Sequence, residues 1–440
     1  MSSVELVELY LDRIERLDPQ LNAFVALGPE RALAEARAPR GGPFAGVPLP
    51  IKDLAETEGL ATTLSTRAFA GYVPERDAGA VARLRAAGFV VIGKTNTPEL
   101  GLIPLTSSEL NGVCRNPWDL ARTPGGSSGG AAAAVAAGLA PAAHGSDGGG
   151  SIRVPASCCN LYGLKPSRGR ISPAPYGDLY GLSSQGALTR TVADAAAMLD
   201  VTAGNELGDP YLCPPPARPF LEEVGADPGR LRIALTLEPP VEAAVDPACA
   251  AAAREAAQLL AELGHDVVEA TPPWRGEELR PLFTRIWQTM PTLYGDEARA
   301  QMEPLARALA DAADAVSSPD YLRGLAAVQA YARRVVSFWR DVDLVLTPTL
   351  ALPPVPVDWN EEFRDPLERF DRNYLFTPFT PVVNLTGQPA ASAPFGWTGD
   401  GLPLGVQLIG RPADEATVLR VSAQLESTRP WRDRRPPVFS

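Results

Sequence analysis

The chain has 440 residues, of which 45% are apolar and 21% charged, and its formal net charge is −12. That length permits one large α/β domain or two to three smaller ones, and the acidic balance argues against nucleic acid, because phosphate binding needs a basic surface. No apolar run reaches the ~18 residues of a membrane-spanning helix, and residues 1–17 form an amphipathic, charged pattern unlike a signal peptide, so we expect no membrane partner and a cytoplasmic location.

Helix and strand patterns alternate through the first half of the chain. Apolar residues spaced i, i+3 and i+4 predict a helix over 4–26. A short strand follows within 46–59, and 77–96 has the pattern of a helix, a glycine stop and a strand. The alanine-rich helix expected over 129–138 has so few polar residues that it must be buried. Residues 187–204 are predicted as a helix with a threonine cap.

A linker rich in proline and glycine, 205–230, precedes the second half. A strand, a helix and a strand follow it, and residues 276–340 are mostly helical in pattern. Strands and prolines return between 342 and 410, before a helix over 413–426. The alternation predicts an α/β fold in which helices pack on a largely parallel or mixed sheet.

Lysine is rare in this chain. Of its 40 basic residues only Lys52, Lys94 and Lys165 are lysines, and the rest are arginines. Arginine does not lose its proton in a protein, so each remaining lysine is a candidate for proton transfer. Lys52 ends the apolar run VPLPI, which suits a desolvated amine; the alternative is an ion pair with Asp53 or another acid.

We expect neither a metal nor a cofactor. The five cysteines and two histidines include no CxxC pair and no metal-ligand spacing. The adjacent Cys158 and Cys159 are most simply small, buried, apolar residues.

Two segments match the strings of familiar sequence motifs, but the surrounding residues do not supply all that those motifs need to function. GFVVIGKT (88–95) satisfies the Walker A string, but its four middle residues are themselves a strand, so no phosphate cradle exists and Lys94 is interpreted as structural. GGSSG (125–129) satisfies the nucleophile elbow of α/β-hydrolases, which needs a later histidine. His265 falls in a helix-to-strand turn, where a surface position is expected, and His144 lies between the two serine clusters. A Ser-His-Asp hydrolase or esterase therefore stays open as an alternative mechanism.

Serines stand in two glycine-rich segments, GGSSGG (125–130) and DGGGS (147–151). A serine hydroxyl is a weak nucleophile that needs a base, and a lysine kept neutral by burial can serve as one. Successive glycine amides can converge on one developing negative charge, although a simple tight turn uses the same residues. The pattern alone leaves both interpretations open.

These segments resemble the motifs of the amidase signature family. The matching segments are GGSSGG (125–130), GSDGGGSIRVPAS (145–157), GLKPSRGR (163–170), PIKD (50–53), GKTNTPELG (93–101), LTPT (346–349), GQPAAS (387–392) and GLPLGVQLIG (401–410). The 24 positions between Ser127 and Ser151 equal the family's spacing. The resemblance spans nearly the whole chain and is loosest over 205–340. It departs from the family at Ser65-Thr66, where Gly-Ser is common, and at Asn160, where many members carry glycine. The chain also begins at what is usually the family's second helix.

The resemblance implies roles for the matched positions. Ser151 corresponds to the nucleophile, Ser127 to a bridging serine after a cis Gly126–Ser127 bond, and Lys52 to the general base. Neutral Lys52 would draw a proton from Ser127 while Ser127 takes one from Ser151. Ser127 would later return a proton to the leaving amine, and water would hydrolyse the acyl-enzyme.

Further matched residues would support this site. The amides of Gly148, Gly149, Gly150 and Ser151 are expected to receive the oxyanion, and Gly126 is expected to be a further residue of the oxyanion hole and substrate site. The supporting residues are Asp147 and Arg153, which would order the loop, and Ser128, which would hydrogen-bond near Ser127.

The resemblance also implies a single large domain over 1–440, with a mixed central sheet flanked by helices on both faces. We predict that 1–204 carries the catalytic residues, 205–340 the substrate pocket and 341–440 the return to the sheet. The segments expected to set acyl specificity are 172–185, 283–296 and 374–384.

The implied activity is that of a cofactor-free amidase, which cleaves a small carboxamide to a carboxylate and an amine or ammonia. The sequences of 145–159 and 163–170 resemble those of family members that act on 6-aminohexanoate cyclic dimers and related amides. Two further alternatives are a glutamine amidotransferase subunit that delivers ammonia to partner subunits, and an inactive homologue that only binds amides. We leave a homodimer open.

Overall fold

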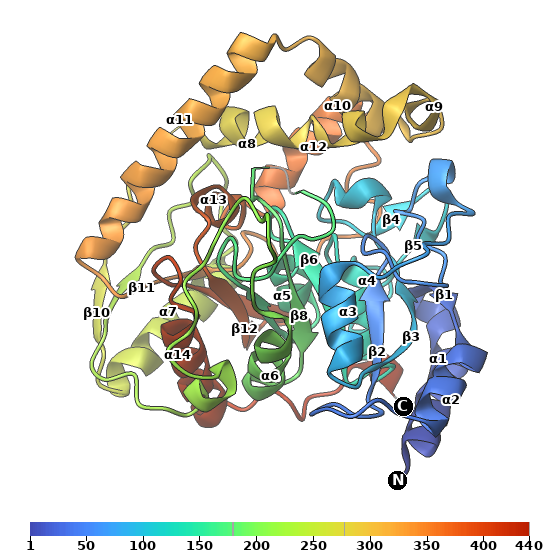
Figure 1. Ribbon diagram of the computed structural model, residues 1–440. Coiled ribbons are helices and arrows are strands. Elements are labelled where there is room, and N and C mark those ends of the chain that lie inside the picture. Colours follow the sequence, from blue (N-terminus) through green and yellow to red (C-terminus); the bar gives the residue numbers. More distant parts are fainter. Residues whose placement is uncertain (178–179, 277, 440) are drawn as a thin grey trace.

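An eight-stranded sheet forms the centre of the protein, whose computed structural model describes residues 1–177, 180–276 and 278–439 (Figure 1). Its strands are β6 (Ala142–Asp147), β7 (Tyr162–Lys165), β8 (Ser184–Thr189), β9 (Arg232–Leu235), β10 (Asp266–Glu269), β11 (Leu344–Pro348), β12 (Ala390–Trp397) and β13 (Pro403–Ile409). They follow the order β10-β9-β11-β13-β12-β7-β8-β6. Strand β9 pairs in parallel with β10 and β11, and the other neighbours pair antiparallel. The prediction of a mixed sheet is confirmed, whereas a largely parallel sheet is wrong.

Two smaller sheets complete the strands. The first has the order β1-β3-β2 and consists of β1 (Phe24–Leu27), β2 (Pro48–Lys52) and β3 (Val90–Thr95). The second pairs β4 (Ser107–Ser108) with β5 (Gly112–Val113). Because β2 ends at Lys52, the small first sheet fixes the backbone of this residue.

Fourteen α-helices are assigned within the described residues. They are α1 (Ser3–Leu21), α2 (Pro29–Arg37), α3 (Gly79–Ala86), α4 (Gly129–Ala136), α5 (Arg153–Cys158), α6 (Val192–Thr202), α7 (Pro247–Glu262), α8 (Leu279–Trp287), α9 (Gly295–Arg299), α10 (Pro304–Asp314), α11 (Ser318–Val336), α12 (Pro366–Phe376), α13 (Pro381–Thr386) and α14 (Glu415–Thr428). Short 3-10 turns are η1 (Arg67–Phe69), η2 (Glu99–Gly101), η3 (Phe220–Glu223), η4 (Met290–Tyr294), η5 (Ser337–Arg340) and η6 (Pro437–Phe439). Within the described ranges, none of the helices is both long and apolar enough to cross a membrane.

Helices cover both faces of the central sheet. In β11, Leu344 and Leu346 pack into a core cluster with α6, α7 and α14, and Val345 packs into another with α8, α11 and α13. Neighbouring residues of a strand point to opposite faces, so the two clusters lie on opposite sides. Figure 1 shows α8 to α12 gathered along the top of the molecule, above the sheet. The chain forms a single α/β domain, and its division at 204 and 340 stays a prediction.

The alanine-rich helix is buried, as predicted. All eight residues of α4 are buried. A side chain on Gly130 would collide with the backbone of Ala23 and Asn96, so the missing side chains let α4 pack directly on neighbouring backbone. The prediction that Cys158 and Cys159 are buried is also confirmed.

Two predicted helices have the wrong boundary. The first ends at Leu21 instead of 26, because Asn22 adopts a left-handed conformation (φ 53°) and the next residues join β1. The helix predicted from 187 starts at Val192 behind the Thr191 cap, because residues 184–189 pair with β6 and β7. In both places strand pairing elsewhere in the chain overrides the helical pattern.

Candidate active site

Ser151 lies in the turn between β6 and α5. The residue is 8% exposed and lines a pocket. Gly150, immediately before it, has φ +131°, and a side chain there would collide with Thr380 Oγ1. Only glycine suits this position, in conformation and in space, so the turn carries Ser151 to the pocket without a side chain in between.

Lys52 is fully buried and points at Ser127. Its Nζ donates to Ser127 Oγ at 2.7 Å, to Ser146 Oγ at 3.1 Å and to the Ser146 carbonyl at 3.3 Å. The Gly126–Ser127 peptide bond is cis, as the resemblance implied. The alternative ion pair with Asp53 is wrong, because that carboxylate accepts from Thr63 Oγ1 at 2.5 Å and lies 3.9 Å from Lys94.

Burial changes the acidity of Lys52. Removal from water disfavours the charged amine and lowers its pKa to about 7, although the negative charge of Asp147 opposes the shift. A neutral amine at 2.7 Å from Ser127 Oγ can accept that hydroxyl's proton. The structure therefore places an amine with a lowered pKa beside the first serine cluster.

Ser128 joins the two serine segments. Its backbone N–H donates to the Ser151 carbonyl at 3.1 Å, and its hydroxyl donates to the Ser146 carbonyl at 3.2 Å. The segment that holds Ser127 is thus bonded directly to the turn that holds Ser151, across 24 positions of sequence. Ser146 was not singled out in the sequence, although it lies within the motif GSDGGGSIRVPAS (145–157).

Asp147 and Arg153 form a buried ion pair under the glycine turn. The guanidinium bonds both carboxylate oxygens, at 2.8 and 3.0 Å. Burial alone would raise the pKa of Asp147, but the Arg153 charge holds it well below its usual range. The carboxylate also accepts the Gly150 and Ile152 N–H groups at 2.8 and 3.1 Å. The pair therefore ties the turn to the start of α5.

One expected oxyanion donor is already engaged. The Gly150 N–H points at Asp147 Oδ1, so it is not free to receive a substrate oxyanion, and the expectation for this amide is corrected. Gly148, Gly149 and Ser151 remain as candidate donors. The Gly149 carbonyl accepts from Thr380 Oγ1 at 2.7 Å, which fixes the peptide plane of the turn. Thr380 lies in 374–384, a segment expected to set acyl specificity, but no local pattern indicates its contact with a turn more than 200 positions away.

The histidines have other partners. His144 Nε2 lies 2.9 Å from Gln185 Oε1, and burial lowers the pKa of His144 to about 3. His265, expected at the surface, is buried: its Nδ1 accepts the Leu231 N–H at 3.2 Å and its Nε2 lies 2.9 Å from Gln424 Oε1. Among the described contacts neither histidine reaches Ser151, which disfavours a Ser-His-Asp mechanism.

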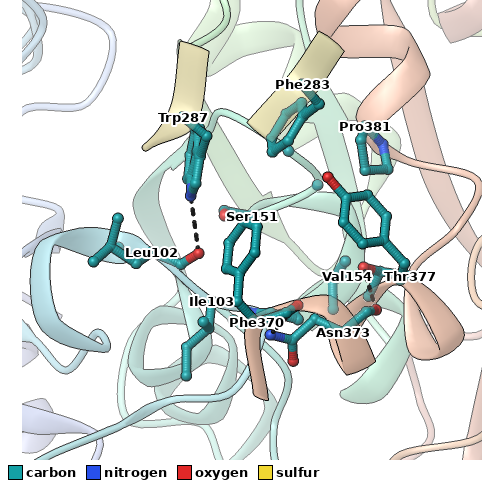
Figure 2. A pocket seen from close by; sticks show the side chains of 16 residues that line it. Leu102, Ile103, Ser151, Val154, Phe283, Trp287, Phe370, Asn373, Thr377 and Pro381 are labelled. Carbon is teal, nitrogen blue, oxygen red and sulfur yellow. Dashed lines mark hydrogen bonds between the residues drawn. The ribbon is translucent and has the colours of Figure 1, made fainter. Parts of the chain in front are cut away.

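A pocket of about 440 Å³, open solvent included, lies over Ser151 (Figure 2). Residues 283–296 contribute Phe283 and Trp287, and residues 374–384 contribute Tyr374, Thr377 and Pro381. The segment 172–185 contributes none of the described lining residues, and 178–179 lie outside the described chain. Lining residues missed in the sequence are those of 101–104, Val154, Phe370 and Asn373.

The α/β fold therefore holds Ser151 in a pocket and the buried amine of Lys52 beside a second serine, an arrangement that suits a hydrolase. A family model described as Amidase matches residues 5–419. The chain therefore belongs to the Amidase family, which carries the amidase signature, and it is an enzyme that hydrolyses amide C–N bonds. The family resemblance found in the sequence is confirmed.

Relatives cover almost the full chain. It is 44% identical to the putative amidase AmiB2 of Mycobacterium tuberculosis, over 98% of this chain and 94% of the relative. It is 38% identical to the 6-aminohexanoate-cyclic-dimer hydrolase of Paenarthrobacter ureafaciens, over 100% and 94%. A solved structure of a 6-aminohexanoate cyclic dimer hydrolase complexed with substrate superposes with a TM-score of 0.95 at 37% identity, covering 100% of this chain and 96% of that one.

Proposed function

We propose that this amidase cleaves a carboxamide to a carboxylate and an amine or ammonia through an acyl-enzyme on Ser151. The observation that carries the proposal is the 2.7 Å contact between the buried Lys52 Nζ and Ser127 Oγ, in a setting that lowers the lysine pKa to about 7. The geometry and the family match support this proton route, because a serine nucleophile needs a base and no histidine of the described chain is placed to act.

The first half of the reaction forms the acyl-enzyme. Neutral Lys52 accepts the Ser127 proton while Ser127 accepts the Ser151 proton, and Ser151 Oγ attacks the carbonyl carbon. The negative charge on the carbonyl oxygen is received by the amides of Gly148, Gly149 and Ser151. Ser127 then protonates the amide nitrogen with the proton that Lys52 returns, and the C–N bond breaks.

The second half releases the acid. A water molecule gives its proton to Ser127, and through it to Lys52, and its oxygen attacks the acyl ester carbon. The ester C–O bond breaks and Ser151 regains a proton. In this scheme Asp147 and Arg153 order the turn, and they contact neither the substrate nor the reacting atoms.

Transfer of ammonia from glutamine to a partner subunit uses the same site chemistry, but the pocket does not favour it. Glutamine carries an ammonium and a carboxylate, and the described lining residues include no charged side chain to pair with either. The cyclic dimer named for the relatives has no charge, so it belongs among the first amides to test.

Covalent labelling and hydrolysis test the proposal together. The wild type should react with a fluorophosphonate and hydrolyse at least one amide of a panel of acetamide, phenylacetamide, glutamine and 6-aminohexanoate cyclic dimer. Ser151→Ala should lose both properties. The control is Ser157→Ala, which removes a buried serine whose hydroxyl accepts the Gly405 N–H and should keep both. Labelling that survives in Ser151→Ala would refute the assignment of the nucleophile.

A further inference from the structure

Aromatic rings from two helices wall the pocket over Ser151 (Figure 2). Phe283 and Trp287 come from α8 and stack with ring centroids 5.1 Å apart and an angle of 26° between planes. Tyr374 of α12 meets Phe283 edge-on at 6.5 Å, and Phe370 meets Tyr374 edge-on at 6.2 Å. The four rings form one continuous apolar surface, which we call the aromatic wall.

The aromatic wall rests on the glycine turn itself. A Cβ on Gly148 would lie 2.7 Å from the Trp287 ring, and one on Gly149 would lie 2.9 Å from the Phe283 ring. The Trp287 indole N–H donates to the Leu102 carbonyl at 3.0 Å, in the segment that forms another side of the pocket. The position of the two rings relative to Ser151 is therefore set by direct contact with the turn that carries it.

The polar side chains near the wall are occupied. Asn373 Nδ2 donates to the Arg369 and Phe370 carbonyls, both at 3.1 Å, and its Oδ1 accepts from Asn360 at 3.0 Å. The Tyr374 hydroxyl lies 3.3 Å from Thr284 Oγ1. No lining residue within the described ranges is an Asp, Glu, Lys or Arg. A charged substrate group placed here would lose its water without gaining a partner.

We propose that Phe283 and Trp287 determine specificity, and that they select an uncharged amide bearing a flat apolar group of about phenyl size. The inference rests on the proposed function, because it places the scissile carbonyl at Ser151. A flat group can pack against the two rings, whose planes differ by 26°, and both rings line the pocket that holds Ser151. Both residues lie in a part of the chain, 205–340, that the family motifs match only loosely.

The test compares three primary amides that share ammonia as the leaving group: phenylacetamide, 4-carboxyphenylacetamide and acetamide. For the wild type, kcat/KM should be at least about 100-fold higher for phenylacetamide than for the carboxylated compound, because the added charge has no partner. Phe283→Leu keeps the site apolar but removes the flat ring. It should lower the ratio of kcat/KM for phenylacetamide over acetamide about tenfold, and Trp287→Phe should lower it in the same direction.

The matched control is Trp339→Phe. Trp339 is another buried tryptophan, 4% exposed, whose indole N–H donates to the Ile409 carbonyl at 3.2 Å, and it does not line the pocket. This variant should keep the wild-type ratio. Thermal unfolding and fluorophosphonate labelling check that every variant is folded and retains a reactive Ser151.

The outcomes separate the two proposals. If the wild type hydrolyses none of the amides of either panel and is not labelled, the proposed function fails. If amides are cleaved but the carboxylated compound reacts as well as phenylacetamide, the inference on specificity is overturned and the proposed function stands. The inference is also overturned if Phe283→Leu lowers kcat/KM equally for phenylacetamide and acetamide, because that result shows a purely structural role.

Discussion

The pH dependence of turnover is the sharpest test of Lys52. Its pKa of about 7 means that the amine is neutral in about half of the molecules at pH 7 and in about one tenth at pH 6. If the neutral amine is the base, kcat/KM for an uncharged amide should level off above pH 8 and be about tenfold lower at pH 6. The substrate itself does not titrate in this range. The fall of kcat/KM toward low pH, which we call the acid limb, therefore reports the titration of a group of the enzyme.

Other groups with a pKa near 7 must be separated from Lys52. Burial also lowers the pKa of Lys165 to about 7, but its Nζ donates to the Pro166 carbonyl at 2.7 Å and does not contact Ser127. Lys165→Met is therefore a matched control, equal in burial and in side-chain change to Lys52→Met. The Lys165 variant should keep the limb, whereas Lys52→Met should lose it together with about 10²- to 10⁴-fold of the rate.

The assay is kcat/KM on phenylacetamide from pH 5 to 9 at constant ionic strength, with each variant's fold checked by circular dichroism. A Lys52→Met enzyme with the wild-type rate would refute the assignment of the base. A limb that disappears in Lys165→Met and persists in Lys52→Met would transfer the titration to the other lysine.

Three further predictions follow from the same electrostatics. Asp147→Asn removes a charge that raises the pKa of Lys52, so the limb should move to lower pH while activity falls with the loosened turn; an unmoved limb would contradict the coupling. His144→Gln should leave the profile between pH 5 and 8 unchanged, because the pKa of His144 is about 3 and it is already neutral there; an inactive but folded variant would restore the histidine alternative. Burial, together with nearby carboxylates, raises the pKa of Glu303 to about 7. Its contribution to stability is therefore present below about pH 4.5 and lost as pH rises through 7, and urea unfolding at pH 5 and pH 8 should show a smaller difference for Glu303→Gln than for the wild type.

Local signals explain which parts of the fold could be predicted. The strand β3 and the helix α4 form from residues whose own pattern suffices, and both appear where expected. The segment after Leu21 continues a helical pattern, yet it becomes β1 because its backbone pairs with β3, more than 60 positions further along. Pairing partners of this kind are not visible within a local window, so boundaries fail where a remote strand competes with a helix.

The candidate site divides in the same way. The serines and the lysine stand in motifs, and the resemblance brought Lys52 and Ser127 together although 75 positions separate them. Outside the motifs, Thr380 and Trp287 fall in segments that were expected to set acyl specificity. Their contacts with the Gly149 and Leu102 carbonyls arise only through the packing of distant helices. Their own segments contain no pattern that indicates these contacts.

The buried arginines and lysines of this chain differ in their partners, and this difference gives a physical reason for the use of lysine at so few positions. The three arginines buried in the described chain each pair with a carboxylate within 3.0 Å: Arg85 with Asp77, Arg153 with Asp147 and Arg170 with Glu415. Lys52 and Lys165 are as deeply buried, but their hydrogen bonds go to hydroxyl and carbonyl oxygens. A guanidinium stays charged and needs a counter-charge when buried, whereas an amine can release its proton instead.

Lys52→Arg should therefore lose stability as well as activity, while Lys52→Met loses activity alone. A folded and active Lys52→Arg enzyme would show that a permanent charge is tolerated beside Ser127, and proton transfer to position 52 would then be excluded.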